Sequence, residues 1–303
     1  MVDGLLEVSV VGSFSRLGYE TRSRMQPWDT HYRLAGNRML ITGGTTGLGY
    51  AAAREAVAAG AVVAITGRDP GRTAAAAARI GAVPLAADAA DLDAMAGLID
   101  RASSELGGLD TLVNNAGALD ADYTLSPQGF ETTYAVHVLA PFLLTALARE
   151  RVQTVIAVSS GGMYSQRLDS AVVEMTAEDY DGVTAYARAK RAQVALTSEW
   201  ARRHPGRPTF AAMHPGWADT PGVQRSLPTF RRVTGPILRT PEQGCDTMLW
   251  LAGHAVPSGL FWLDRAPRST VRLPWLRYGQ DEMATCFDMV AEQVRPWLGA
   301  ATL

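Results

Sequence analysis

The chain has 303 residues, with 28 basic side chains against 30 acidic ones and two cysteines, Cys245 and Cys286. This length is sufficient for one large α/β domain, and a net charge of −2 gives no field that would attract nucleic acid or an acidic membrane. Two distant cysteines make neither a metal cluster nor a disulfide framework. No apolar run reaches the roughly 18 residues of a membrane span, and the N-terminus lacks the pattern of a secretion signal. We therefore expect a cytoplasmic protein.

Residues 1–36 stand apart from the rest of the chain. Val8–Val11 fits either a short strand or part of a helix, and apolar residues are scattered among arginines. Two interpretations are open: an amphipathic arm that binds a membrane surface or a partner, and an extension that packs on its own domain. We favour the second, because the apolar spacing is irregular and lysine is absent.

From Arg38 onward, short apolar runs alternate with helical patterns. The predicted strands span residues 39–42, 61–66, 83–87, 109–113, 152–158, 209–213 and 260–263. The predicted helices span residues 48–59, 70–80, 91–105, 126–149, 185–203, 241–252 and, in a tail, 281–294, with a bend expected before Pro141. The alternation predicts a single Rossmann-like, doubly wound parallel sheet of about seven strands with helices on both faces. We divide the chain into an N-terminal extension (1–36), one domain holding cofactor and catalytic site (37–264) and a tail (265–303).

A glycine-rich turn joins the first predicted strand to its helix. The glycines are Gly43, Gly47 and Gly49, which is not the G-x-G-x-x-G spacing of the standard dinucleotide site. Glycines allow close approach to a phosphate, and the helix N-terminus offers free N–H groups. Without its context, the same pattern fits an ordinary strand–helix turn.

Polar residues follow the next strands. Arg68 and Asp69 come after the second strand. At this position an arginine suits the 2′-phosphate of NADP, and an acid suits the 2′-hydroxyl of NAD. We favour NADP; the alternative is that the two side chains form a solvated ion pair with no role in binding. Asp88, followed by Ala89, either accepts from an adenine amino group or is a turn residue. Asn114, Asn115, Ala116 and Gly117 form a turn able to admit a sugar.

Tyr186 and Lys190 lie four residues apart on a predicted helix and share one face. An ammonium beside a phenol lowers the phenol pKa from about 10, so that Tyr186 becomes a usable acid or base; the alternative is a chance pair on a solvated helix. Ser160 follows the fifth strand and suits a substrate carbonyl or alkoxide. The turn containing Pro215, Gly216 and Thr220 suits a nicotinamide carboxamide, or is an ordinary turn.

In this order, the motifs resemble the short-chain dehydrogenase/reductase family over residues 36–264, and more narrowly its dehydrogenase/reductase member 12 subgroup. The matching stretches are Thr42–Gly49, Asn114–Gly117, Ser159–Met163, Tyr186 with Lys190, His214–Val223, Gly244–Leu251 and Gly18–Glu20. The resemblance implies that Tyr186 exchanges the proton, that Lys190 lowers its pKa and holds the ribose, and that Ser160 orients the substrate oxygen. It assigns to the cofactor Gly43, Thr45, Thr46, Gly47, Leu48, Gly49, Arg68, Asp88, Ala89, Asn115, Ala116, Gly117, Tyr186, Lys190, Pro215, Gly216 and Thr220.

Two departures accompany the resemblance. The family's catalytic asparagine should fall at 136–138, where this chain has His137, a side chain able to hold a water and relay a proton. Residues Asp169–Thr184 must loop out, and we expect them over the substrate mouth; such spacing also occurs in retinol- and carbonyl-reductase-type members.

The resemblance implies an NADP-dependent oxidoreductase that interconverts an alcohol and a carbonyl. The alternative, for which His137 speaks, is a non-catalytic nucleotide-binding regulator or scaffold; a nucleotide-sugar epimerase would need a larger C-terminal domain. An apolar substrate is expected from the mouth residues Met163, Tyr164, Trp217, Leu227, Phe230 and Trp262. The helices 126–149 and 185–203 resemble the family's dimer helices, so a homo-oligomer is expected, a dimer or tetramer.

Overall fold

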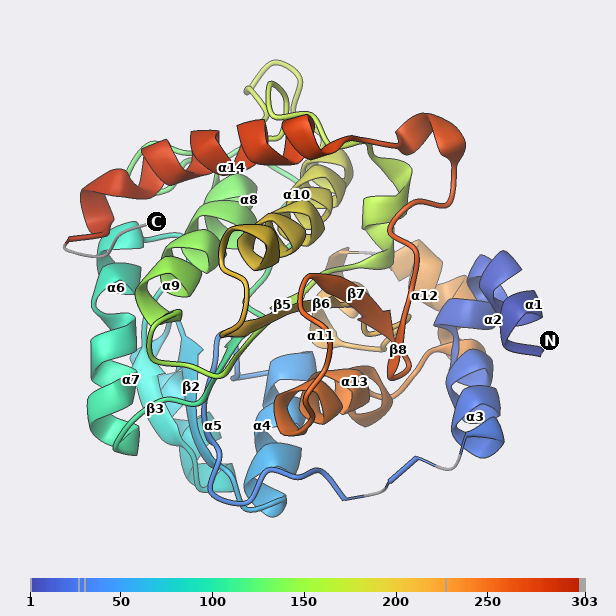
Figure 1. The fold of residues 1–303 in the computed structure, drawn as a ribbon, viewed down its shortest axis with the longest axis horizontal. Helices are drawn as coiled ribbons and strands as arrows, with labels where there is room; N and C mark the ends of the chain where they lie inside the picture. Colours follow the sequence, from blue (N-terminus) through green and yellow to red (C-terminus); the bar gives the residue numbers. More distant parts are fainter. Residues whose placement is uncertain (1, 27, 30, 227, 300–303) are drawn as a thin grey trace.

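Eight strands form one sheet at the centre of the computed structural model, which describes residues 2–26, 28–29, 31–226 and 228–299 (Figure 1). The strand order is β3-β2-β1-β4-β5-β6-β7-β8, and every neighbouring pair is parallel except β7–β8. The strands are β1 Arg38–Ile41, β2 Val62–Gly67, β3 Val83–Ala86, β4 Thr111–Asn114, β5 Thr154–Val158, β6 Thr209–Met213, β7 Leu260–Leu263 and β8 Ala266–Pro267. The doubly wound fold is therefore confirmed, and each of the seven predicted strands is present.

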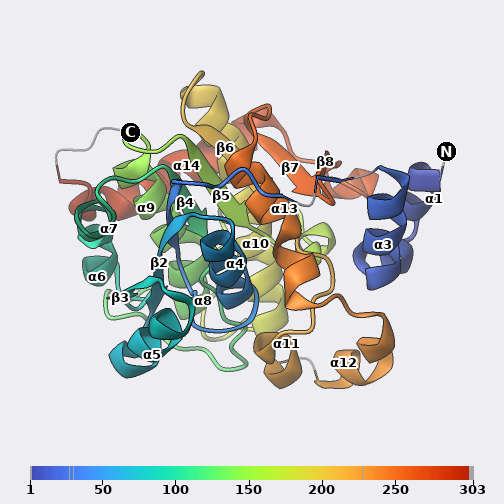
Figure 2. The same cartoon turned by 90° about the horizontal axis from the view of Figure 1, so that it is seen from below.

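The sheet is buried on both faces, which explains the continuous apolar runs of its strands. In β1, Leu40 joins one core cluster, while Met39 and Ile41 join the cluster on the opposite face. The first face is covered by α6 Leu92–Ala96, α7 Leu98–Leu106, α8 Thr132–Tyr134, α9 Ala140–Ala148, α10 Gly182–Arg203 and α14 Gln280–Val294. The second face is covered by α4 Gly47–Ala58, α5 Pro70–Ile80 and α13 Pro241–Gly253 (Figure 2).

Two predicted helices differ from the structure. The helix predicted over 91–105 is broken at Gly97 into α6 and α7. The helix predicted over 126–149 begins only at Thr132, because the Glu131 carboxylate accepts hydrogen bonds from the amides of Thr133 and Tyr134 and caps it there. The distortion expected before Pro141 is a π-helical turn over Ala135–Leu139, which contains His137. Such turns occur often at functional sites.

The two ends of the chain pack on this frame. The N-terminal arm forms α1 Val2–Val8, α2 Val10–Phe14 and α3 Arg16–Met25, beside the β7–β8 edge (Figures 1 and 2). The helical interpretation of the arm is thus the observed one. The tail helix α14 lies across α9 and α10, where Phe287 contacts Phe142 and Trp200 with ring centroids 4.8 Å apart in each pair. No helix in the described part of the chain is long and apolar enough to span a membrane.

Candidate functional site

The glycine turn between β1 and α4 has the geometry of a phosphate-binding turn. Gly43 and Gly47 have positive φ angles of 67° and 58°, which favour glycine. A Cβ at Gly49 would lie 2.4 Å from the Gly43 carbonyl oxygen, so the turn closes only without a side chain there. The N-cap residue Thr46 makes no side-chain cap bond, which leaves the first N–H groups of α4 without a capping side chain. These features fit a bound pyrophosphate.

The turn after β4 holds the glycine turn in place. Asn115 Nδ2 donates to the carbonyl oxygens of Thr42 at 2.8 Å and Gly43 at 3.2 Å, and Thr42 Oγ1 accepts from the amides of Asn115 and Ala116. A Cβ at Gly43 would lie 2.8 Å from Ala116 Cα. The structure therefore brings Asn115 and Ala116 to the glycine turn, and the side-chain amide of Asn115 holds the backbone there.

At the predicted adenosine end, Arg68 directly follows β2, is exposed and makes no ion pair within the described residues. Asp69 instead caps α5, accepting from the amide of Arg72 at 2.8 Å, so the pair of Arg68 with Asp69 is not found. Asp88 accepts from the amide of Ala90 at 3.1 Å, as a turn residue does.

The predicted catalytic residues come together between β5 and α10. A hydrogen bond with Ser160 acts to lower the pKa of the Tyr186 phenol. The Ser160 hydroxyl also accepts from the amide of Gly162 at 3.2 Å. Ser159 is buried, and its hydroxyl donates to the Lys190 carbonyl oxygen at 2.9 Å. The second serine of the pair is thus the one beside the Tyr186 phenol.

Lys190 is the only lysine of the chain, and its side chain is 3% exposed. Its ammonium donates to the Val158 carbonyl oxygen at 2.7 Å and to Gln193 Oε1 at 3.0 Å, and lies 5.5 Å from the centre of the Tyr186 ring. Burial lowers the pKa of Lys190 to about 7. The pKa of Tyr186 is raised, because burial outweighs its hydrogen bond with Ser160. The prediction that Lys190 lowers the phenol pKa is contradicted, since the ammonium is turned toward Val158 of β5 and Gln193.

His137 is fully buried in the π-helical turn and packs edge-on against the Tyr186 ring, with centroids 5.2 Å apart. Its Nε2 lies 2.7 Å from the Ala118 carbonyl oxygen, and a Cβ at Gly117 would lie 2.5 Å from its ring. Burial and the charge of Lys190 hold its pKa well below the usual range, so the ring is neutral. In this arrangement His137 supports the 115–118 turn and the phenol by packing.

Gln193 is a site residue that the sequence reasoning missed. It lies three positions after Lys190 on α10, so helical spacing could have indicated it. With Asn114 and His137 it lines a cavity of about 30 Å³, and neither Gln193 Nε2 nor Asn114 Oδ1 has a partner among the described residues. The rest of the lining is mostly apolar, and the volume is enough for a water, which needs about 10–15 Å³, to bond these two amide groups.

The loop after β6 reaches the glycine turn. A Cβ at Gly47 would lie 3.4 Å from Thr220 Cβ, and Gly216 has a φ of 73°. Thr220 Oγ1 also accepts from the amide of Val223, near the start of α11 Pro221–Ser226. Pro215 is buried. The predicted nicotinamide end thus lies next to the predicted pyrophosphate turn.

The predicted apolar mouth is only partly present. Trp217 and Phe230 are half-buried, with ring centroids 5.2 Å apart. Met163 and Trp262 are core residues, and the Tyr164 hydroxyl donates to the Ser269 carbonyl oxygen, so these three are corrected to structural roles. Leu227 lies outside the described residues.

The segment expected to loop out is irregular up to Asp181, and α10 begins at Gly182. It packs on the domain: Val173 joins the core, the Tyr180 hydroxyl donates to the Asp120 carbonyl oxygen, and Glu174 accepts from the amide of Glu131. It also lines a cavity of about 460 Å³ with residues of α8 and α14. The segment therefore lies along α8 and α14.

Comparisons with known proteins agree with this arrangement. The family model for short chain dehydrogenase matches residues 37–229. Dehydrogenase/reductase SDR family member 12 of Bos taurus is 37% identical over 87% of this chain and 88% of that protein, and human retinol dehydrogenase 12 is 32% identical over 74% of this chain and 75% of that protein.

Among solved structures, a short chain dehydrogenase of Burkholderia cenocepacia in complex with NADP superimposes with a TM-score of 0.59 and 29% identity, covering 73% of this chain and 92% of that one. A 3-ketoacyl-(acyl-carrier-protein) reductase of Brucella melitensis has the same fold, with a TM-score of 0.60 and 22% identity over 75% of this chain and 96% of that one. On these matches, the chain belongs to the short-chain dehydrogenase/reductase family and is an NAD(P)-dependent oxidoreductase.

Proposed function

We propose that this protein uses NADP(H) to interconvert an alcohol and a carbonyl on a small apolar substrate, with Ser160, Tyr186 and Lys190 as its catalytic residues. The observation that carries the proposal is the placement of the Tyr186 phenol beside Ser160, at the same end of the sheet as the glycine turn. Ligands in open α/β sheets bind at this end.

In the proposed reaction, a bound nicotinamide supplies or accepts the hydride. For a reduction, the Ser160 hydroxyl donates a hydrogen bond to the carbonyl oxygen and the Tyr186 phenol gives it a proton. The raised pKa of the phenol keeps it protonated, as a proton donor must be. For the reverse direction, Lys190 would have to leave Val158 and Gln193 and approach the phenol, so that its charge favours the phenolate.

The preference for NADP rests on the end of β2. The Arg68 guanidinium is exposed and unpaired within the described residues, while the Asp69 carboxylate is used as the cap of α5. The fork of an arginine suits a phosphate, whereas an engaged carboxylate is less available to a 2′-hydroxyl. We keep the cofactor-binding residues that the resemblance assigns. In the proposal, Asn115 and His137 hold the backbone of the turns that enclose the cofactor.

The proposal also includes a substrate class, a homo-oligomeric assembly and a cellular location. Trp217 and Phe230 remain as apolar mouth residues, and one relative is named as a retinol dehydrogenase. We retain a homo-oligomer in the proposal, but α14 covers α9 and α10, so its interface would use another surface. A cytoplasmic location is retained too; Cys245 and Cys286 are buried and free, as is usual in a reducing compartment.

The testing experiment is a fluorescence titration with NADPH and, in parallel, NADH. We expect NADPH to bind at least about tenfold more tightly, a gap of roughly 1.4 kcal/mol, and Arg68→Ala to abolish that gap without weakening NADH. A carbonyl screen with NADPH follows, in which Tyr186→Phe should lose turnover and keep its affinity for NADPH. Failure to bind either nucleotide would contradict the proposal, as would full turnover by Tyr186→Phe.

A further inference from the structure

The N-terminal arm is joined to the predicted nicotinamide loop by a buried ion cluster. The Asp264 carboxylate accepts from Arg239 at 2.6 Å and from Arg22 of the arm at 2.7 Å, and all three side chains are at most 4% exposed. Asp264 itself has a positive φ of 54°, in the turn between β7 and β8. Removing Asp264 would leave Arg239 buried without an ion-pair partner in the described part of the chain, while Arg22 would keep Asp3 and Glu7, so Asp264 is the group that joins the arm to the sheet edge.

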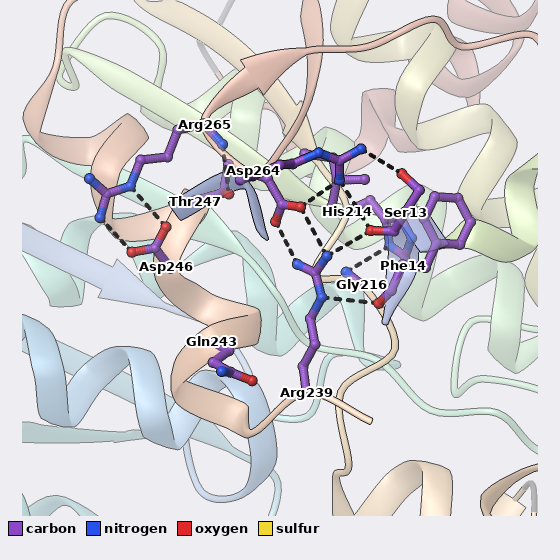
Figure 3. A network of polar contacts seen from close by, with 12 residues as sticks. Ser13, Phe14, His214, Gly216, Arg239, Gln243, Asp246, Thr247, Asp264 and Arg265 are labelled. Carbon is purple, nitrogen blue, oxygen red and sulfur yellow. Dashed lines mark hydrogen bonds and ion pairs between the residues drawn. The ribbon is translucent and has the colours of Figure 1, made fainter. Parts of the chain in front are cut away.

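The backbone of the arm continues this contact. The Phe14 carbonyl oxygen accepts from the amide of Trp217 at 2.7 Å and from Arg239 Nε at 3.0 Å. The amide of Arg239 donates in turn to the Trp217 carbonyl oxygen at 2.7 Å. Figure 3 shows Arg239 between Asp264 and the arm residues Ser13 and Phe14. The loop that starts at His214 is therefore held between the arm and Arg239.

The Phe14 ring touches both loops of the site. It lies edge-on to His214, with centroids 4.3 Å apart, and a Cβ at Gly161 would lie 3.0 Å from the ring. Gly161 directly follows Ser160, and His214 opens the loop that contains Gly216 and Thr220. The ring is 2% exposed, so it packs behind these loops and does not face a substrate.

From these contacts we infer that Phe14 is a positioning residue, through which the arm sets the place of Ser160 and of the loop at the nicotinamide end. The inference rests on the proposed function for what the two loops bind. Arg68, which would hold the adenosine end, is exposed after β2 and lies outside the two loops that Phe14 contacts. Loss of Phe14 should therefore loosen one end of the cofactor site and leave the other intact.

The experiment compares Phe14→Ala with Phe287→Ala in the full chain. Both phenylalanines are buried, but Phe287 contacts the rings of Phe142 and Trp200 and not His214 or Gly161, which makes it the matched control. Two affinities are measured: that for NADPH, and that for adenosine 2′,5′-bisphosphate, which carries only the adenosine end. We expect Phe14→Ala to raise the Kd for NADPH about tenfold and to change that for the bisphosphate less than twofold. Phe287→Ala should leave the ratio of the two unchanged.

Hydrogen–deuterium exchange gives a second readout that needs no nucleotide. Peptides covering 159–165 and 214–220 should exchange about tenfold faster in Phe14→Ala, while peptides of α14 keep their wild-type exchange. In Phe287→Ala, peptides of α14 should exchange faster and the two loop peptides should be unchanged. Phe14→Leu removes the ring but keeps an apolar side chain, so the same two peptides should exchange more slowly than in Phe14→Ala and still faster than in wild type; this variant decides the matter if Phe14→Ala does not fold. Wild-type exchange and an unchanged affinity ratio in Phe14→Leu and Phe14→Ala would overturn the inference. If the wild-type chain binds no dinucleotide, the proposed function is overturned but the inference about Phe14 is not. Hydrogen–deuterium exchange would still show whether Phe14 holds the two loops in place.

Discussion

The Lys190 ammonium donates to the side-chain oxygen of Gln193 at 3.0 Å, three residues further along the same helix. Its other partner is the Val158 carbonyl oxygen, and it makes no ion pair in the described part of the chain. Water stabilises a charged ammonium, and a buried ammonium with neutral partners loses part of that stabilisation. Burial therefore lowers the pKa of Lys190 to about 7. Because the chain has a single lysine, this group can be observed alone.

The first prediction is the titration of Lys190 itself. In protein labelled with [¹³C]lysine, one ε-carbon resonance should titrate with a midpoint near 7 in the absence of cofactor. The physical cause is burial without a carboxylate partner. A midpoint close to 10.5, the ordinary value of lysine, would show that the ammonium is solvated and that the arrangement with Gln193 is incorrect.

The second prediction concerns stability against pH. Between pH 7 and about 10 the unfolded lysine holds its proton and the folded one does not, so the unfolded state binds more protons and stability rises with pH, by at most about 1.4 kcal/mol per unit. The gain is lost as pH falls through 7. Urea unfolding of wild type and Lys190→Met should therefore differ in slope between pH 7 and 9, and parallel curves would contradict the shifted pKa.

The third prediction is that Gln193→Glu raises the pKa of Lys190. A carboxylate at the position of the amide oxygen, 3.0 Å from the ammonium, favours the charged form by at least about one pKa unit. The labelled resonance should move its midpoint upward accordingly. Gln193→Met, which keeps the size and removes the acceptor, should move it downward; identical midpoints in both variants would show that Gln193 does not act on Lys190.

The fourth prediction separates packing from titration at His137. His137→Asn removes the contact with the Ala118 carbonyl oxygen and shrinks a fully buried side chain, so we expect a loss of about 1–3 kcal/mol in unfolding free energy. The pH dependence of turnover should keep its inflections, because the buried ring stays neutral. An inflection near pH 6 to 7 that disappears in His137→Asn would instead make His137 a titrating member of the site.

The fifth prediction concerns the ion cluster that fixes the arm. Asp264→Ala leaves Arg239 buried without an ion-pair partner among the described residues and takes from Arg22 one of its three carboxylates, so it should cost about 3–5 kcal/mol in urea unfolding. Asp100→Ala is the control, because Asp100 pairs with Arg151 at the exposed surface, where such pairs are worth about 0–1 kcal/mol. Similar small losses in both variants would mean that the cluster does not hold the arm.

Much of the fold could be read from periodicity. Every predicted strand lies within about two residues of the observed one, because runs buried on both faces are short and apolar and end at polar tips. The strand β8 was not predicted, since it has two residues and depends on positive φ angles at Asp264 and Arg265. The apolar periodicity also does not predict that Glu131 caps α8 or that a π-helical turn forms at His137.

Spacing along the chain was enough to predict the succession of strands and helices, the glycine turn, and the placing of Ser160, Tyr186 and Lys190 on elements that meet at one end of the sheet. These features depend on local patterns, which are written directly in the residue order. The contact of Lys190 with Gln193 and the packing of Phe14 against His214 and Gly161 emerged from the folded chain alone. Rotamers and contacts between residues two hundred positions apart follow from packing and from the pairing of buried charges, neither of which has a period along the chain.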